Sequence, residues 1–450
     1  MSPMISNPGP GAAFRRELGI EIASGYHANH RKRKAVLVKG LNLFLVLFIG
    51  ILFLRCSNNP VSTPTQPFEL TAAEKSLIES DNKFGLKLFK KIIEEEGDKN
   101  VFISPLSVSM ALGMTYNGAN GSTQKAMQKT LELSGLTVQE INESYQNLIG
   151  LLTQLDPKVQ FQIANSIWYR EDFQQPEEEF LNLCDEYFNA LVTGLNFNDP
   201  NAAAIINAWV EESTNGKIEE IVDAPINPAY VMFLLNAIYF KGAWMYRFDE
   251  EFTCDDYFIL SDGTEKICQM MSQRGLYPHY AFDDFRVLDL PYGDGAFRMT
   301  ILLPNEGVDL DSLIAQFDPD NLNLSLMDYW LSNFSRDSLD IFIPRFTLEY
   351  EVNLTDVLTA LGMGIAFTPY VADFTKMYPA GGVWIDEVKH KTFVEVNEEG
   401  TEAAAVTSTI ITTGSDDSVF RVDRPFVFVI RENYSQTILF IGKIVDPTGG

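Results

Sequence analysis

The hydrophobic pattern of this chain is helical in its first third and strand-like in most of the remainder. Apolar residues recur at helical spacing over residues 70–96, which predicts a surface helix. A short apolar strand then turns into a second helix, with Ser104 as its N-cap and Pro105 at the first helical position. A glycine-rich break is expected over residues 115–123, with another helix starting at Ser122.

Long apolar runs with β-branched and aromatic residues predict the strands. Residues 161–169 and 231–240 have the composition of strands buried on both faces, and residues 201–221 between them are typical of a helix that carries Trp209. Strands dominate residues 252–303. The last third is expected to contain a strand at 339–347 interrupted by Pro344, a helix at 354–361 that closes at Gly362, an alternating strand at 388–396, and an apolar strand pair at 425–430 and 437–444. Helices come mainly first and strands mainly later, without a βαβ period, which indicates an α+β fold.

One segment, residues 398–415, has a composition that is unusual for a surface loop. It begins with Glu398, Glu399 and Gly400, and its residues 403–413 include no charge, no proline and no aromatic ring. Surface loops are usually punctuated by Pro, Gly, Asn and Asp. We interpret the segment as a loop that is able to become a strand in the middle of a sheet.

Composition and charge indicate a large acidic body behind a basic N-terminal segment. The 450 residues are 46% hydrophobic, which is ample for a large core. The net charge is −27, yet the first 55 residues carry eight Lys or Arg against two Asp or Glu. The remainder is therefore strongly acidic and would repel a phosphate backbone, so nucleic acid is not an expected partner.

The N-terminal segment predicts export. A basic cluster at residues 31–34 precedes an apolar run at 41–54, whose length is typical of a signal-peptide core. An apolar core followed by Cys56 resembles a bacterial lipoprotein signal, in which that cysteine is lipidated, although Arg55 stands where such signals have a small residue. The alternatives are a start site further downstream, a short retained anchor, or a buried cytosolic helix. We expect a signal or anchor segment at residues 1–56, a proline-containing polar linker at 57–67, and one folded domain at 68–450, located outside the cell or on its surface.

The sequence lacks the motifs of the common enzyme classes. Residues 57–450 contain two histidines, His279 and His390, and no nucleophile elbow, zinc-protease motif, dinucleotide-binding motif or P-loop. We therefore expect no catalysis, no cofactor and no metal. The four cysteines are too few for a disulfide scaffold, and a bridge between Cys254 and Cys268 across a hairpin is one option, with two free thiols as the other.

Several segments, in order along residues 68–447, resemble the serpins, a family of serine protease inhibitors. The resemblance implies one domain of three β-sheets and about eight or nine helices, with an exposed reactive-centre loop that links the largest sheet to another sheet. It is carried by Asn-Val-Phe-Ile-Ser-Pro-Leu-Ser from Asn100, Asn-Ala-Ile-Tyr-Phe-Lys-Gly-Ala-Trp from Asn236, Gln-Met-Met-Ser from Gln269, Ile-Pro-Arg-Phe from Ile343, the segment from Glu398, and Arg-Pro-Phe-Val-Phe from Arg424.

The resemblance also implies a mechanism and a reactive bond. An inhibitory serpin offers its loop to a protease, which cleaves it and forms an acyl-enzyme; the freed loop then inserts into the main sheet and traps the enzyme. Sixteen residues on from Glu398 and eleven residues back from Pro425 both lead to Gly414, so Gly414–Ser415 is the predicted bond.

The start of the loop fits the requirements of insertion. Gly400 is able to bend without a Cβ penalty, and residues 401–414 span roughly 45 Å when extended at about 3.3 Å per residue. In a strand Glu402 would face solvent, whereas the uncharged Thr401, Ala403, Ala405, Thr407, Thr409 and Ile411 would face the core. A plain Ala/Thr linker is the alternative. The predicted hinge comprises Glu398, Glu399, Gly400, Thr401, Glu402, Ala403, Ala404, Ala405, Val406 and Thr407.

Two further groups of residues follow from the resemblance, one residue at a time. Ser104, Ser107, Asn236 and His390 match the polar cluster, or shutter, where the main sheet parts; a satisfied core histidine is the alternative for His390. Trp244, Arg345 and Glu398 match the breach, the point where the loop enters the sheet, with Arg345 as the basic partner of Glu398; a core aromatic residue is the alternative for Trp244.

The residues before the reactive bond indicate the class of target protease. Gly414 offers no side chain to a specificity pocket, which disfavours trypsin-like enzymes, and the small residues with Ile411 suit elastase-like or subtilisin-like serine proteases. Cleavage at Thr412 or Thr413 and inhibition of a papain-like cysteine protease are alternatives. The rival function is a non-inhibitory serpin that acts as a cell-surface binding protein. In either case we expect a monomer.

Overall fold

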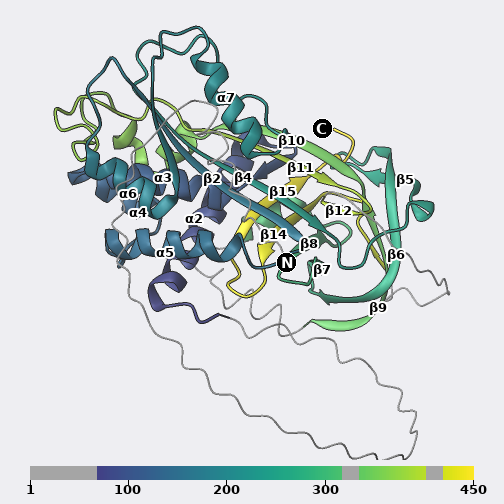
Figure 1. The fold of residues 1–450 in the computed structure, drawn as a ribbon. Coiled ribbons are helices and arrows are strands. Elements are labelled where there is room, and N and C mark those ends of the chain that lie inside the picture. The colour runs from purple at the N-terminus through teal and green to yellow at the C-terminus, as the bar shows by residue number, and fades with distance from the viewer. Residues whose placement is uncertain (1–67, 317–333, 402–418, 450) are drawn as a thin grey trace, which may run out of the picture.

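The computed structural model describes residues 68–316, 334–401 and 419–449 (Figure 1). The predicted signal segment, the linker, Cys56, hinge residues 402–407 and the bond Gly414–Ser415 lie outside the described residues. No described helix combines the length and the apolar character that crossing a membrane requires.

The N-terminal third is helical, as expected. Helix α2 (Ala72–Glu96) begins at Thr71, whose side chain forms a capping box with Glu74. Strand β1 (Val101–Ile103) leads into α3 (Pro105–Gly118), where Ser104 caps the helix by accepting a hydrogen bond from the Ser107 amide at 3.3 Å. The next helices are α4 (Gly121–Thr130), α5 (Val138–Leu152) and α6 (Glu178–Phe188), and Figure 1 shows α2 to α6 gathered on one side of the molecule.

Two helix boundaries differ from the expectation. The break predicted at 115–123 shrinks to two residues, because α3 continues to Gly118, where a side chain would collide with Met377. The helix predicted at 201–221 is α7 (Ala202–Ser213), and it ends early because Asn215 and Gly216 take positive φ values of 53° and 76°.

A nine-stranded sheet holds most of the later strands. Its order is β1-β15-β14-β8-β7-β6-β9-β13, with β5 paired to β6. Every residue of β14 and β15 is buried. Within this nine-stranded sheet, buried Arg431 donates to Asp289 Oδ1 at 2.9 Å, and Arg298 donates to Asp289 Oδ2 at 2.7 Å. The strands are β5 (Cys254–Ile259), β6 (Glu265–Ala281), β7 (Phe285–Tyr292), β8 (Phe297–Pro304), β9 (Ser335–Pro344), β13 (Val419–Arg421), β14 (Phe426–Glu432) and β15 (Ile438–Ile444).

The remaining strands form two separate ladders. The first has the order β12-β4-β2-β3, from β12 (Gly400–Thr401), β4 (Met232–Ala243), β2 (Val159–Arg170) and β3 (Ala190–Leu195). The second pairs β10 (Phe346–Asn353) with β11 (Lys389–Val396). Helix α7 covers the outer face of the first ladder, where Trp209 packs edge-on against Trp168 of β2.

The described residues contain eight α-helices and three ladders of strands, which confirms the α+β fold. The last two α-helices are α8 (Leu310–Gln316) and α10 (Thr355–Leu358), which continues as a π-helical turn to Met363.

The expectation that residues 231–240 are buried on both faces is wrong, because residues 231–236 are only half-buried.

The thiols of Cys254 and Cys268 are free. In the β5–β6 hairpin Cys254 lies opposite Met270, and Cys268 lies opposite Asp256. The two cysteines are therefore diagonal neighbours, whose Cα atoms are typically about 7–8 Å apart and beyond the reach of a disulfide. The offset of the pair about the turn is the reason that no bridge forms.

Candidate functional site: the cleft between β4 and β11

The two separate ladders face each other across a boundary that we call the β4–β11 cleft. Among the described residues no hydrogen-bonded ladder joins β4 to β11. Two cavities of about 20 Å³ each lie between them, one lined by residues 238–240 and 393–395 and one by residues 235–238 and 390–392. A larger cavity opens at the end of the cleft nearest Met232 and Lys389. Within the described part of the chain, β11 therefore has one edge without a partner strand, and β4 has one edge without a partner along most of its length.

The predicted hinge enters the head of this cleft. After β11 the chain turns back on itself, with Asn397 and Gly400 exchanging backbone hydrogen bonds of 3.0 and 3.2 Å. Gly400 then pairs with Ala243 and Thr401 pairs with Gly242, antiparallel to β4. The described part of the hinge thus already adds two residues to the free edge of β4.

Gly400 is required at this turn for a reason beyond flexibility. Its φ is 135°, and a Cβ atom there would lie 2.2 Å from the carbonyl oxygen of Gly242 and 2.6 Å from the amide nitrogen of Trp244. No side chain fits such a contact with the backbone of β4. The sequence predicted that the backbone bends at Gly400. In the structure, the absence of a side chain there also permits β12 to approach β4 closely.

The breach residues converge on this turn. Buried Glu398 accepts a hydrogen bond from the Thr253 hydroxyl at 2.8 Å, and Arg345 lies 3.6 Å from its other carboxylate oxygen. Its backbone carbonyl accepts from the Phe248 amide at 3.0 Å. The Arg345 side chain is 51% exposed whereas that of Glu398 is 4% exposed, so water screens the ion pair from one side only.

Trp244 lies beneath the point where the hinge enters. Its indole Nε1 donates to the Asn397 carbonyl at 2.9 Å, and its amide donates to the Glu399 carbonyl at 3.0 Å. The ring stacks on Tyr292 with centroids 4.4 Å apart and is buried. Two polar contacts to the hinge turn distinguish this tryptophan from an ordinary core aromatic residue.

The shutter residues lie halfway along the cleft, where the N-terminus of α3 contacts both of its sides. Towards β11, the Ser104 amide donates to His390 Nε2 at 3.0 Å. Towards β4, the Ser107 hydroxyl donates to the Asn236 carbonyl at 3.5 Å. The Asn236 side chain donates to Asn165 Oδ1 at 2.8 Å, while its own Oδ1 is buried and accepts no hydrogen bond among the described residues.

His390 is neutral in this position. Burial lowers its pKa to about 4 because the charged imidazolium would lose its hydration. Since Nε2 accepts from the Ser104 amide, the ring proton is on Nδ1. The neutral His390 ring is thus bound to α3 by the hydrogen bond that its Nε2 accepts from the Ser104 amide, and protonation of Nε2 would abolish this bond.

Several contacts of this site had no signal in the sequence. Thr253 and Asn165 were not singled out, and each contacts its site residue from a distant segment: Thr253 is 145 residues from Glu398, and Asn165 is 71 residues from Asn236. The predicted roles of the hinge, shutter and breach residues remain predictions. The described hinge, shutter and breach residues all lie around the β4–β11 cleft.

The described residues thus form a divided sheet, with the start of a loop paired at its head. Residues 79–447 match the family model described as Serpin (serine protease inhibitor). A serpin-like protein of Thermococcus kodakarensis is 32% identical over 416 residues, covering 88% of this chain and 94% of that protein. The leukocyte elastase inhibitor of Xenopus laevis is 34% identical over 371 residues, covering 81% and 97%. The native thermophilic serpin tengpin superposes with a TM-score of 0.73 at 29% identity, covering 85% of this chain and 97% of tengpin.

The chain belongs to the serpin family. Members of this family are mostly protease inhibitors rather than enzymes.

Proposed function

We propose that this protein is an inhibitory serpin that traps a serine protease by inserting its cleaved reactive loop into the β4–β11 cleft. One observation carries the proposal: the hinge has already paired two residues with the edge of β4 that faces the cleft, and no other described strand lies between β4 and β11. A strand entering from this point would satisfy both free edges.

Extending the existing register gives each loop residue a partner. Ala403 would lie opposite Phe240, Ala405 opposite Ile238 and Thr407 opposite Asn236, continuing the pairs at Gly400 and Thr401. Phe240 belongs to the main core and Ile238 is partly buried against it, and the loop residues opposite them, Ala403 and Ala405, are small and uncharged. The cavities of about 20 Å³ there suit alanine better than any larger side chain. Thr407 would arrive beside Asn236, whose Oδ1 needs a hydrogen-bond donor.

The proposed target is an elastase-like or subtilisin-like serine protease. Gly414 and the small residues before it support this class, as does similarity to proteins named leukocyte elastase inhibitor. A papain-like cysteine protease is the second target class. The basic cluster and apolar run before Cys56 support a site of action outside the cell, with lipid attachment at Cys56.

The direct test is to mix the protein, produced from Ser57 onward, with pancreatic elastase and with subtilisin. We expect a complex that survives denaturing electrophoresis, together with a released peptide beginning at Ser415. A peptide beginning at Thr413 or Gly414 would move the bond without changing the mechanism. Loop cleavage without any complex, across serine and cysteine proteases, would instead identify a non-inhibitory serpin that binds a partner by other means.

A further inference from the structure

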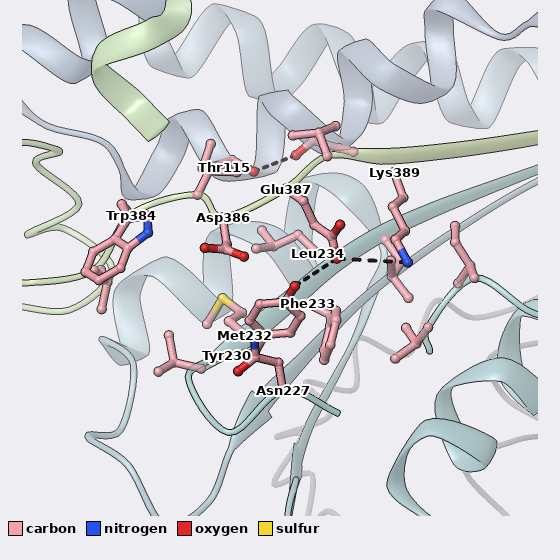
Figure 2. A pocket seen from close by; sticks show the side chains of 18 of the residues that line it. Thr115, Asn227, Tyr230, Met232, Phe233, Leu234, Trp384, Asp386, Glu387 and Lys389 are labelled. Carbon is pink, nitrogen blue, oxygen red and sulfur yellow. Dashed lines mark hydrogen bonds and ion pairs between the residues drawn. The ribbon is translucent and has the colours of Figure 1, made fainter. Parts of the chain in front are cut away.

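A cavity of about 420 Å³ lies at the end of the β4–β11 cleft nearest Met232 and Lys389 (Figure 2). This volume is in the range of small-molecule sites. Residues 231–236 form one wall, and His390 and Lys391 border the opposite side. Most of the remaining lining comes from residues 221–230 and 374–388, which lie outside both strands.

The cavity overlaps the path of the loop along residues 232–236 of β4 and residues 389–391 of β11, and it extends beyond that path. A strand inserted in the existing register would end its pairing with β4 at Met232, where β4 begins. The non-strand segments that close the cavity offer no ladder for it beyond that point. The residues of segments 221–230 and 374–388 that line the cavity therefore need an explanation other than insertion of the loop.

The cavity wall is rich in apolar and aromatic surface that is only partly covered. Tyr230 and Trp384 are half-buried, and Tyr230 packs edge-on against Phe233 with ring centroids 5.7 Å apart. Tyr378 and Phe374 are buried deeper in the wall. Two accessible aromatic rings beside an aliphatic wall provide both dispersion contacts and π faces for a ligand.

The polar part of the cavity is acidic. Figure 2 shows Asp386 and Glu387 on the side of the cavity that Tyr230 faces, and the Tyr230 hydroxyl donates to Glu387 at 3.0 Å. Lys389 lies 4.0 Å from Glu387 and also pairs with Asp223. Among the described residues no lysine or arginine forms an ion pair with Asp386.

The remaining cation of the lining is directed elsewhere. Lys391 pairs with Glu349 at 2.7 Å and lies 3.7 Å from Glu351. The pKa of Tyr230 is raised first by burial and then by the negative charges of Glu387 and Asp386. The potential beside the Tyr230 ring is therefore negative.

We propose that this cavity binds an organic ammonium ion with an aromatic or apolar body. Carboxylates and aromatic faces are the two protein groups that attract such ions most strongly, and here they occur together. The cationic head would lie between Asp386 and the rings of Trp384 and Tyr230, and the body would pack against residues 231–235. This binding requires neither loop cleavage nor protease inhibition.

Three probes that share one naphthyl ring test the proposal by isothermal titration calorimetry on the full-length protein. They are (2-naphthylmethyl)trimethylammonium, 2-naphthaleneethanol and 2-naphthaleneacetate. The ammonium probe should bind one site with a dissociation constant on the order of 10–100 µM, about tenfold more tightly than the alcohol. The carboxylate should bind more weakly still. Equal affinity for all three probes, or no binding of the ammonium probe, would overturn the proposal.

Variants locate the site. Asp386→Asn and Trp384→Leu should each weaken the ammonium probe about fivefold to tenfold. The matched control is Glu94→Gln, which removes an exposed carboxylate on α2 and should change nothing. Because Asp386 is exposed, its variant should fold normally, as circular dichroism would check. Equal weakening by Asp386→Asn and Glu94→Gln would mean attraction to the protein's overall charge and would contradict a site in this cavity.

Discussion

The nine-stranded sheet and the divided sheet use similar apolar strands in different ways. In the first, β14 has partners on both sides, is wholly buried, and carries the Arg431–Asp289 pair. In the second, β4 is paired with β2 on one side and is half-buried along residues 232–236. On its other side, the described residues pair with it at Gly242 and Ala243 alone. In the described residues, the inner strands of the first sheet have partners on both sides, whereas β4 and β11 each have an edge that lacks a partner strand along most of its length.

The difference indicates where free energy remains to be gained. A backbone hydrogen bond contributes about 1 kcal/mol net, so a strand that pairs with both free edges would gain on the order of 10 kcal/mol. That gain is available only if the incoming residues fit the core, which explains the small side chains predicted to face inward. The completed sheet offers no comparable gain.

The largest expected effect concerns strand entry. Thr401→Arg places a charge on the predicted inward face at Thr401, which with Gly242 forms the last described pair, and burying this charge should prevent insertion. The trapped fraction should fall more than about tenfold, while the loop is cleaved at the same rate. Electrophoresis of elastase mixtures measures both products.

Glu402→Arg is the matched control for that variant, because the alternation of a strand puts residue 402 on the solvent face. It should still trap protease. If both variants trap equally well, the assigned faces are wrong.

The next effect concerns the completed sheet. Asp289→Asn leaves Arg431 and Arg298 without their buried carboxylate and should cost about 3–5 kcal/mol of unfolding free energy. Asp340→Asn removes the partner of Arg274 in a partly exposed pair and should cost at most about 1 kcal/mol. Urea unfolding of both variants makes the comparison, and a smaller loss for Asp289→Asn would weaken the contrast between the two sheets.

A somewhat smaller effect concerns pH at the shutter. The folded-state pKa of His390 is lowered to about 4 from its ordinary 6.5 by burial, so the unfolded chain takes up this proton first as pH falls. Its contribution to stability is complete above pH 6.5 and declines by about 3 kcal/mol as pH falls to about 4. His390→Gln should lack this decline, which urea unfolding between pH 4.5 and 7.5 would reveal.

A second buried group acts in the opposite direction over this range. Burial raises the pKa of Asp81 to about 7, so stability from this carboxyl falls as pH rises from about 4 to 7. The test of His390 is therefore the difference between wild type and variant, with His279→Gln as control. A wild-type slope that persists in His390→Gln would refute the assignment.

Elements with a local signal were predictable from the sequence. The cap at Ser104, the hairpin between Cys254 and Cys268 and the terminal strand pair depend on neighbouring residues, and all formed as expected. The alternation of β11 was equally readable, because one of its faces contacts the core.

Features that depend on distant segments were not predictable. The end of α7, the half-burial of β4 and the contact of Thr253 with Glu398 each result from packing between segments far apart in the sequence. Gly400 shows the limit most clearly. The sequence indicated a hinge. That a Cβ atom at residue 400 would lie 2.2 Å from the Gly242 carbonyl oxygen is evident only once β4 is beside it.

The measurement that tests the central claim most directly is the melting temperature of the protein before and after its loop is cut by elastase. If the freed loop completes the divided sheet, the melting temperature should rise by about 10–20 °C, from a gain on the order of 10 kcal/mol. An unchanged or lower melting temperature, with cleavage in residues 412–415 verified by mass spectrometry, would contradict insertion into the β4–β11 cleft.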